Sequence, residues 1–175
     1  MSRRVSLFLL AFLCAAGVSA GAAQDRPPAR PGDVGSIDSI LTTLYAVISG
    51  PVGQPRQWDR FFSLMHPDAR LVPTRCGPGG ACSLQSMTPE EYRTRADSIL
   101  VAIGFHESEL KRSTERYGAI AQAFSSYQSF RGEETKPFAR GINSIQLFWD
   151  GSRWWVLSIF WDSERASNPL PPAFE

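Results

Sequence analysis

The chain has 175 residues, of which 43% are hydrophobic and 11% aromatic, and it carries 18 Lys and Arg against 17 Asp and Glu. This length and composition fit one ordinary domain with an apolar core of its own. The near-zero charge argues against binding to nucleic acid or to an anionic membrane surface, because both require a basic field.

The first residues are typical of a secretory signal peptide. Arg3 and Arg4 precede an apolar run that is too short to span a bilayer, and a stretch of small residues follows it. We therefore predict a signal peptide over 1–23 and a flexible leader, rich in Pro and Gly, over 24–35. The mature protein is expected to be periplasmic or secreted, with no membrane association after cleavage.

Three helices are predicted in the N-terminal half. Apolar residues at helical spacing predict the first from Ser36 to Gly50, and a short second helix over Trp58–Met65 gathers aromatic side chains. The third helix begins at Thr88, where Glu91 completes a capping box, and it ends at Gly104.

The segment between the second and third helices is predicted to turn and then form a strand. Pro67 disfavours helix at His66, and Asp68 can accept from nearby backbone N–H groups, so we expect a turn over 66–69. A strand then leads to Cys76 and Cys82, which bracket a loop rich in Gly and Pro. In an oxidising compartment this pair predicts a structural disulfide, and the spacing does not match the redox motif Cys-x-x-Cys.

From Phe105 onward the pattern is typical of β-structure. Strands are predicted over about 105–116 and 119–130, followed by a hairpin from Ile142 to Trp161 around Asp150-Gly151. The proline-rich tail, 165–175, is expected to be a surface strap or a disordered end.

The terminal hairpin also predicts which side chains face inward. Strand alternation places eight residues on the concave face: Asn143, Ile145, Leu147, Trp149, Trp155, Leu157, Ile159 and Trp161. With two tyrosines from other elements, these suggest a small-molecule pocket formed by Tyr45, Tyr127, Asn143, Trp155 and Trp161. The alternative is plain core packing. The outer face carries large aromatic residues, which favours a homodimer formed through the sheet.

Two phrases and the order of the elements carry a family resemblance. The segments Phe62–Leu71 and Trp149–Trp154 resemble the helix-to-strand turn and the terminal hairpin of the nuclear-transport-factor-2-like (NTF2-like) superfamily, which includes ketosteroid isomerase and SnoaL-type cyclases. The resemblance covers 36–164. It implies an α+β cone, in which a curved antiparallel sheet carries about three helices from the N-terminal half on its concave face and encloses a pocket. Many members dimerise through the outer face of the sheet.

The resemblance does not carry over the catalytic residues of ketosteroid isomerase. The position of its base falls near Pro73, and the position of its oxyanion tyrosine falls near Thr43, with Tyr45 displaced by two residues. An isomerase of that type is therefore rejected. His66 and Asp68 remain candidates for acid–base catalysis, while their alternative role is to stabilise the turn.

No metal or other cofactor is expected, because neither His66 nor His106 belongs to a spaced set of ligands. A run of mixed charges begins at Glu107 and Glu109 and continues to Arg116. It is either a polar pocket wall or docking edge, or a solvated strand with cross-strand ion pairs. His106 should lie on the opposite face from both carboxylates.

The sequence thus favours an exported domain that binds a small apolar molecule in a cone-shaped pocket. Two alternatives stay open. One is a pocket enzyme, of dehydratase, isomerase or hydrolase type, that uses His66 or Asp68. The other is a dimeric interaction domain that holds no ligand.

Overall fold

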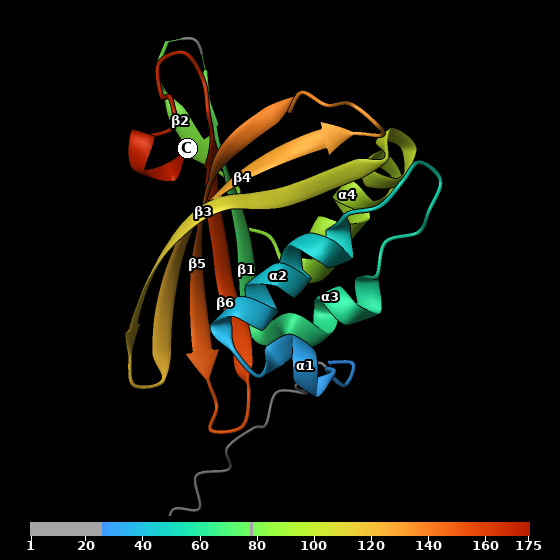
Figure 1. Ribbon diagram of the computed structural model, residues 1–175, viewed down its shortest axis with the longest axis vertical. Helices are drawn as coiled ribbons and strands as arrows, with labels where there is room; N and C mark the ends of the chain where they lie inside the picture. Colours follow the sequence, from blue (N-terminus) through green and yellow to red (C-terminus); the bar gives the residue numbers. More distant parts are fainter. Residues whose placement is uncertain (1–25, 78) are drawn as a thin grey trace, which may run out of the picture.

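The structure is a computed structural model that describes residues 26–77 and 79–175 (Figure 1). The predicted signal peptide, 1–23, lies outside the described residues. Within the described part of the chain, no helix is long and apolar enough to cross a membrane.

The elements follow the expected α+β order. The helices are α1 (Pro31–Val34), α2 (Ile37–Ile48), α3 (Trp58–Leu64) and α4 (Pro89–Ile103), with a terminal 3-10 helix η1 (Pro172–Phe174). The strands are β1 (Met65–Cys76), β2 (Cys82–Leu84), β3 (Phe105–Tyr117), β4 (Ile120–Arg131), β5 (Ala139–Trp149) and β6 (Trp154–Ser163).

The six strands form one curved sheet in the order β2-β1-β6-β5-β4-β3. The helices lie on its concave side, and the sheet bends around them to form an open cone (Figure 1). The predicted α+β cone is confirmed, with one difference from a purely antiparallel sheet: β1 runs parallel to β6. These two strands are far apart in sequence and no hairpin joins them, so no tight turn imposes an antiparallel pairing.

Local sequence signals account for the element boundaries. Ser36 caps α2, and Thr88 and Glu91 form the predicted capping box of α4. Gly104 ends α4 with a φ of +61°, in the left-handed region that favours glycine. In the β5–β6 turn, one Asp150 oxygen accepts from the backbone N–H groups of Ser152 and Arg153.

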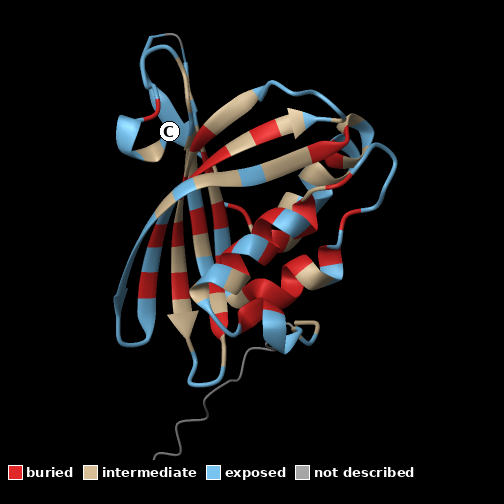
Figure 2. Cartoon of the chain, viewed as in Figure 1, coloured by how far each residue is buried: buried red, intermediate tan, exposed pale blue. Residues whose placement is uncertain are grey.

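The core lies between α2, α3 and the concave face of the sheet, as the buried positions in Figure 2 show. The inward face of α2 buries Ile40, Leu41 and Leu44, as helical spacing predicted, and Val47 is buried as well. Small Ala121 and Ala123 on β4 are also buried.

The predicted turn at 66–69 is wrong in form, because these residues belong to β1. Met65 pairs with Val156 and Arg70 pairs with Ser158, so four residues of β1 stand opposite a single residue of β6. Pro67 has no N–H group to donate, so the regular hydrogen-bond ladder between β1 and β6 is interrupted here without ending the strand. Cys76 and Cys82 do form the predicted disulfide, across the paired ends of β1 and β2.

Both ends of the described chain pack against the domain. In the segment predicted as a leader, α1 buries Asp33, which receives two hydrogen bonds from Arg60. The tail runs over the outer face of the sheet, where the Ser126 hydroxyl donates to the Phe174 carbonyl at 2.7 Å and Leu170 is buried. The tail therefore has the form of a surface strap.

Candidate functional site

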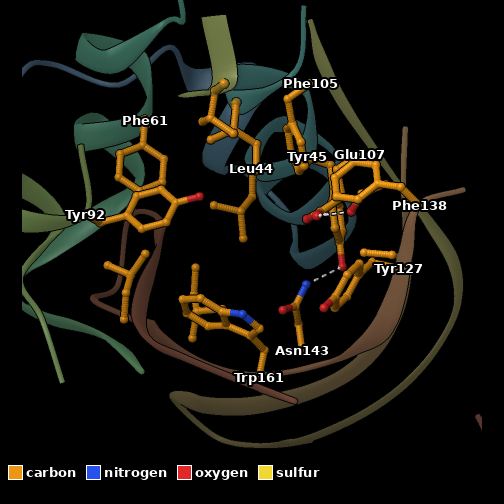
Figure 3. A pocket seen from close by; sticks show the side chains of 16 residues that line it. Leu44, Tyr45, Phe61, Tyr92, Phe105, Glu107, Tyr127, Phe138, Asn143 and Trp161 are labelled. Carbon is orange, nitrogen blue, oxygen red and sulfur yellow. Dashed lines mark hydrogen bonds between the residues drawn. The ribbon is translucent and has the colours of Figure 1, made fainter. Parts of the chain in front are cut away.

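A cavity of about 250 Å³ opens between α2, α4 and the concave face of the sheet (Figure 3). Its wall is mostly apolar, with a few polar groups, which is the usual composition of a small-molecule site. Seven aromatic rings contribute to it: Tyr45, Phe61, Tyr92, Phe105, Tyr127, Phe138 and Trp161.

Sheet register brings the polar residues of the cavity together from distant parts of the chain. Glu107 on β3 pairs with Ser129 on β4, and Asn143 on β5 pairs with Trp161 on β6. The two residues of each pair share one face of the sheet. All four line the cavity, so this face is the one that points toward the helices. Tyr45 reaches the same space from α2.

Glu107 is the ionisable acid of the cavity. One carboxylate oxygen accepts from the Ser129 hydroxyl at 2.8 Å, while the other has no hydrogen-bond partner among the described residues. No Arg, Lys or His is among the described residues that line the cavity. Burial raises the pKa of Glu107 to about 7, although the Ser129 hydrogen bond acts in the opposite direction. Glu107 can therefore gain or lose a proton near neutral pH.

A chain of hydrogen bonds fixes the orientation of Asn143 and Tyr45. Asn143 Nδ2 donates to Tyr45 Oη at 3.1 Å, and Tyr45 Oη lies 2.7 Å from Ser125 Oγ. Ser125 gives its one hydroxyl proton to Glu109 at 2.5 Å, so the phenol proton of Tyr45 must go to Ser125. Asn143 consequently turns its carbonyl oxygen, which has no partner among the described residues, toward the cavity.

The tyrosines of the cavity stay neutral over the physiological range. Burial raises the pKa of Tyr127 to about 12, and it raises the pKa values of Tyr45 and Tyr92 as well. Because Tyr45 is neutral and its proton is already donated, it is not a free donor for a developing oxyanion.

The structure brings four of the five predicted pocket residues together. Tyr45, Tyr127, Asn143 and Trp161 all line the cavity, while Trp155 does not. Instead, the Trp155 ring packs under Arg153 at 3.6 Å, and its indole N–H donates to Asp150.

A bulge in β6 explains the misplacement of Trp155. Gln146 pairs with Ser158 but Leu147 pairs with Val156, which leaves Leu157 as an extra residue that is 39% exposed. One extra residue reverses the alternation of side chains. Trp154 and Val156 therefore face inward before the bulge, and Ile159 and Trp161 face inward after it.

The two catalytic candidates, His66 and Asp68, do not line the cavity. The His66 ring packs edge-on against Phe148 and Trp155, whose neighbours Leu147 and Val156 point inward, so His66 lies on the outer face. His66 Nδ1 accepts from the backbone N–H of Asp68 at 3.2 Å. This contact matches the alternative role of the two residues, which is to stabilise the local backbone.

Glu107 is the functional candidate that sequence reasoning did not single out. It was placed in a mixed-charge run that was either a pocket wall or a solvated strand. The available signal was strand alternation, which places Glu107 and Glu109 on the sheet face opposite His106. The pairing of β3 with β4 confirms that arrangement. The sequence did not show that this face is covered by helices.

Comparisons with known proteins show the fold and no activity. No protein-family model matches the sequence, and no curated protein does. A crystal structure from Nostoc punctiforme, described as a protein of unknown function with a cystatin-like fold, aligns with a TM-score of 0.55 and 10% identity, over 74% of this chain and 90% of that one. At this identity the similarity shows a shared fold alone.

Two further solved structures are similar at lower scores. An NTF2-like protein of unknown function from Methylobacillus flagellatus has a TM-score of 0.47 and 13% identity, over 74% of this chain and 95% of that one. A "putative ketosteroid isomerase" from Kribbella flavida has a TM-score of 0.44 and 13% identity, over 81% of this chain and 87% of that one. No property of either protein is transferred to this chain.

Proposed function

We propose that this protein binds a small, predominantly apolar molecule in the cavity between α2, α4 and the sheet. The observation that carries the proposal is an aromatic wall that holds two polar atoms, on Glu107 and Asn143, without hydrogen-bond partners among the described residues. Both atoms belong to residues that line the cavity, so a ligand or water there is expected to satisfy them. We further propose, from the signal-like N-terminus and the disulfide, that the protein works outside the cytoplasm.

Filling the cavity is expected to abolish binding without unfolding the protein. Ala139 lines the cavity, so the ring of Ala139→Phe would occupy or close the space. The neutral probe 3,3-dimethylbutan-1-ol, titrated by NMR, should shift the backbone amides around the cavity in the wild type. Its affinity should fall at least about tenfold in the variant, as expected when a preformed pocket is lost.

The matched control is Ala102→Phe, which places the same ring at an exposed position of α4. It should bind the probe as the wild type does. If Ala139→Phe, folded as judged by its thermal midpoint, binds the probe with wild-type affinity, the cavity is not the binding site. Native mass spectrometry of protein from an oxidising compartment would show whether a small molecule is already bound.

Proton transfer on a bound molecule is a second candidate function, and the position of Glu107 favours it. A carboxyl group with a pKa of about 7 inside a pocket is suited to acid–base catalysis near neutral pH. Simple binding is better supported, because the Tyr45 proton is committed to Ser125 and not to a substrate oxygen.

Deuterium exchange distinguishes the two functions. The ketone 3,3-dimethylbutan-2-one has nearly the shape of the neutral probe and carries exchangeable protons beside its carbonyl group. A proton-transfer site would catalyse their exchange in deuterated buffer, and Glu107→Gln would abolish that catalysis because an amide cannot accept the proton. Exchange at the buffer rate in the wild-type protein would leave binding as the function.

A further inference from the structure

We propose that the ligand of the cavity is a small organic cation of the alkylammonium class, held by Glu107 and the surrounding aromatic rings. This inference rests on the proposed binding function and narrows it to one chemical class. Three observations support it: an acid without a counter-charge in the described chain, a wall of aromatic rings, and the placement of hydrogen-bond acceptors.

The first observation is the absence of a cationic partner for Glu107 in the described chain. Asp33, the acidic residue that is buried in the described chain, has one, because it pairs with Arg60. Glu107 receives only the Ser129 hydroxyl. Because buried charges in proteins are normally paired, the missing positive charge is expected to come from the ligand.

The second observation is the aromatic wall. Figure 3 shows Glu107, Tyr45, Phe138 and Tyr127 on one side of the open space, with Tyr92 on the other and Trp161 below. The faces of such rings attract cations, and the attraction grows when water is excluded. A carboxylate beside several rings therefore favours a cation over a neutral molecule of the same shape, and it repels an anion.

The third observation is the direction of the hydrogen-bond chain from Asn143 to Glu109. Since the Asn143 amide group donates to Tyr45, the side chain presents its oxygen and not its nitrogen to the cavity. The free oxygens of Glu107 and Asn143 are both acceptors, so the ligand is expected to carry positive charge, hydroxyl protons or amine protons.

Within the physiological pH range, the charge of the cavity depends on the ionisation of Glu107. The groups that face it are the phenols of Tyr45, Tyr92 and Tyr127, which stay neutral because burial raises their pKa values. On its own strand, Glu109 lies near Arg112 at 3.6 Å, and His106 stands on the opposite face. Affinity for a permanent cation should therefore rise with pH through the titration of Glu107 and level off above it.

A pair of isosteric probes tests the role of charge alone. Choline and 3,3-dimethylbutan-1-ol share their shape and hydroxyl group, and choline has nitrogen in place of the quaternary carbon. We expect wild-type protein to bind choline more tightly than the alcohol at pH 8. Choline affinity should be about tenfold higher at pH 8 than at pH 6, because the ionised fraction of an acid with a pKa of about 7 rises by that factor. The alcohol should show no such rise.

Two variants connect the preference to Glu107. Glu107→Gln keeps the shape of the side chain and removes its charge, so it should lose both the preference for choline over the alcohol and the pH dependence. Glu115→Gln, at an exposed position of the same strand, should behave as the wild type.

The outcomes separate the inference from the proposed function. If wild-type protein binds the alcohol at least as tightly as choline at pH 8, the cation inference is wrong and the binding function stands. If the preference survives in Glu107→Gln, Glu107 is not its source and the inference is also wrong. If neither probe shifts the resonances of the cavity residues, the proposed function and the inference fail together.

Discussion

Replacing Gly141 with Ala is expected to destabilise the fold by about 3 kcal/mol, at the upper end of the usual cost of overpacking. Gly141 lies on β5, directly opposite Tyr127. An added Cβ would clash with the Asp162 carbonyl oxygen and stand 2.6 Å from Tyr127 Oη. The first of these atoms belongs to the backbone of the neighbouring strand, so the clash cannot be relieved by a side-chain rotation.

The thermal midpoint measures this effect. A loss of 3 kcal/mol corresponds to a fall of about 6–12 °C for a domain of this size. The matched control is Gly32→Ala in α1, where an added Cβ meets nothing within 4 Å, and its midpoint should stay the same or rise slightly. Equal midpoints for the two variants would show that the packing around Gly141 is looser than described. Because Tyr127 lines the cavity, Gly141→Ala should also weaken binding of the neutral probe.

The stability of the wild-type protein is expected to carry a pH-dependent contribution from Glu107. The pKa of this carboxyl group is about 7 in the folded chain, against an ordinary value of 4.5, so the folded state binds more protons than the unfolded state between these values. Stability from this group therefore falls as pH rises from about 4.5 to 7 and stays low above that range. The total change in the free energy of unfolding from this group is about 3 kcal/mol, because each unit of pKa difference corresponds to about 1.4 kcal/mol.

Urea unfolding at pH 5 and pH 8 tests this contribution. Glu107→Gln does not titrate, so it should gain about 3 kcal/mol relative to wild type between the two pH values. Taking the difference in the free energy of unfolding between wild type and variant removes the contributions of the other titrating groups. Glu115→Gln serves as a control, and its free energy of unfolding should depend on pH as that of the wild type does. If wild type and Glu107→Gln differ in free energy of unfolding by the same amount at both pH values, Glu107 is no harder to ionise in the folded state than in the unfolded chain.

The pH prediction and the probe experiments concern one structural problem, namely a carboxylate that lies among aromatic rings without a cationic partner in the described part of the chain. The empty site should be least stable when Glu107 is ionised, and a bound cation should recover that loss. We therefore expect choline to raise the thermal midpoint more at pH 8 than at pH 6, and to have little effect on Glu107→Gln.

Much of the fold could be predicted from the sequence because its signals are local. The capping box of Thr88 and Glu91 and the Asp150 turn act within four residues, and the apolar spacing of α2 depends only on helical geometry. The element order then indicated the α+β cone. The predictions for Tyr45, Tyr127, Asn143 and Trp161 followed from the same periodicities.

Local signals failed where the chain departs from regular alternation. The bulge at Leu157 moves Trp155 to the outer face, and the irregular start of β1 turns a predicted turn into strand. Either feature depends on the register against a partner strand. That register is set by contacts distant in sequence, and one extra residue is enough to exchange the two faces.

The sequence by itself determined most of the elements, the single sheet, the disulfide and most of the residues that point inward. Only the tertiary structure decided the character of the site, because a carboxylate in water and one in a cavity are the same letter in the sequence. Glu107 lies on an edge strand, and the docking of α2 and α4 against the concave face places this half-buried acid in the wall of a cavity. Its environment, and with it the chemistry of the cavity, follows from that packing.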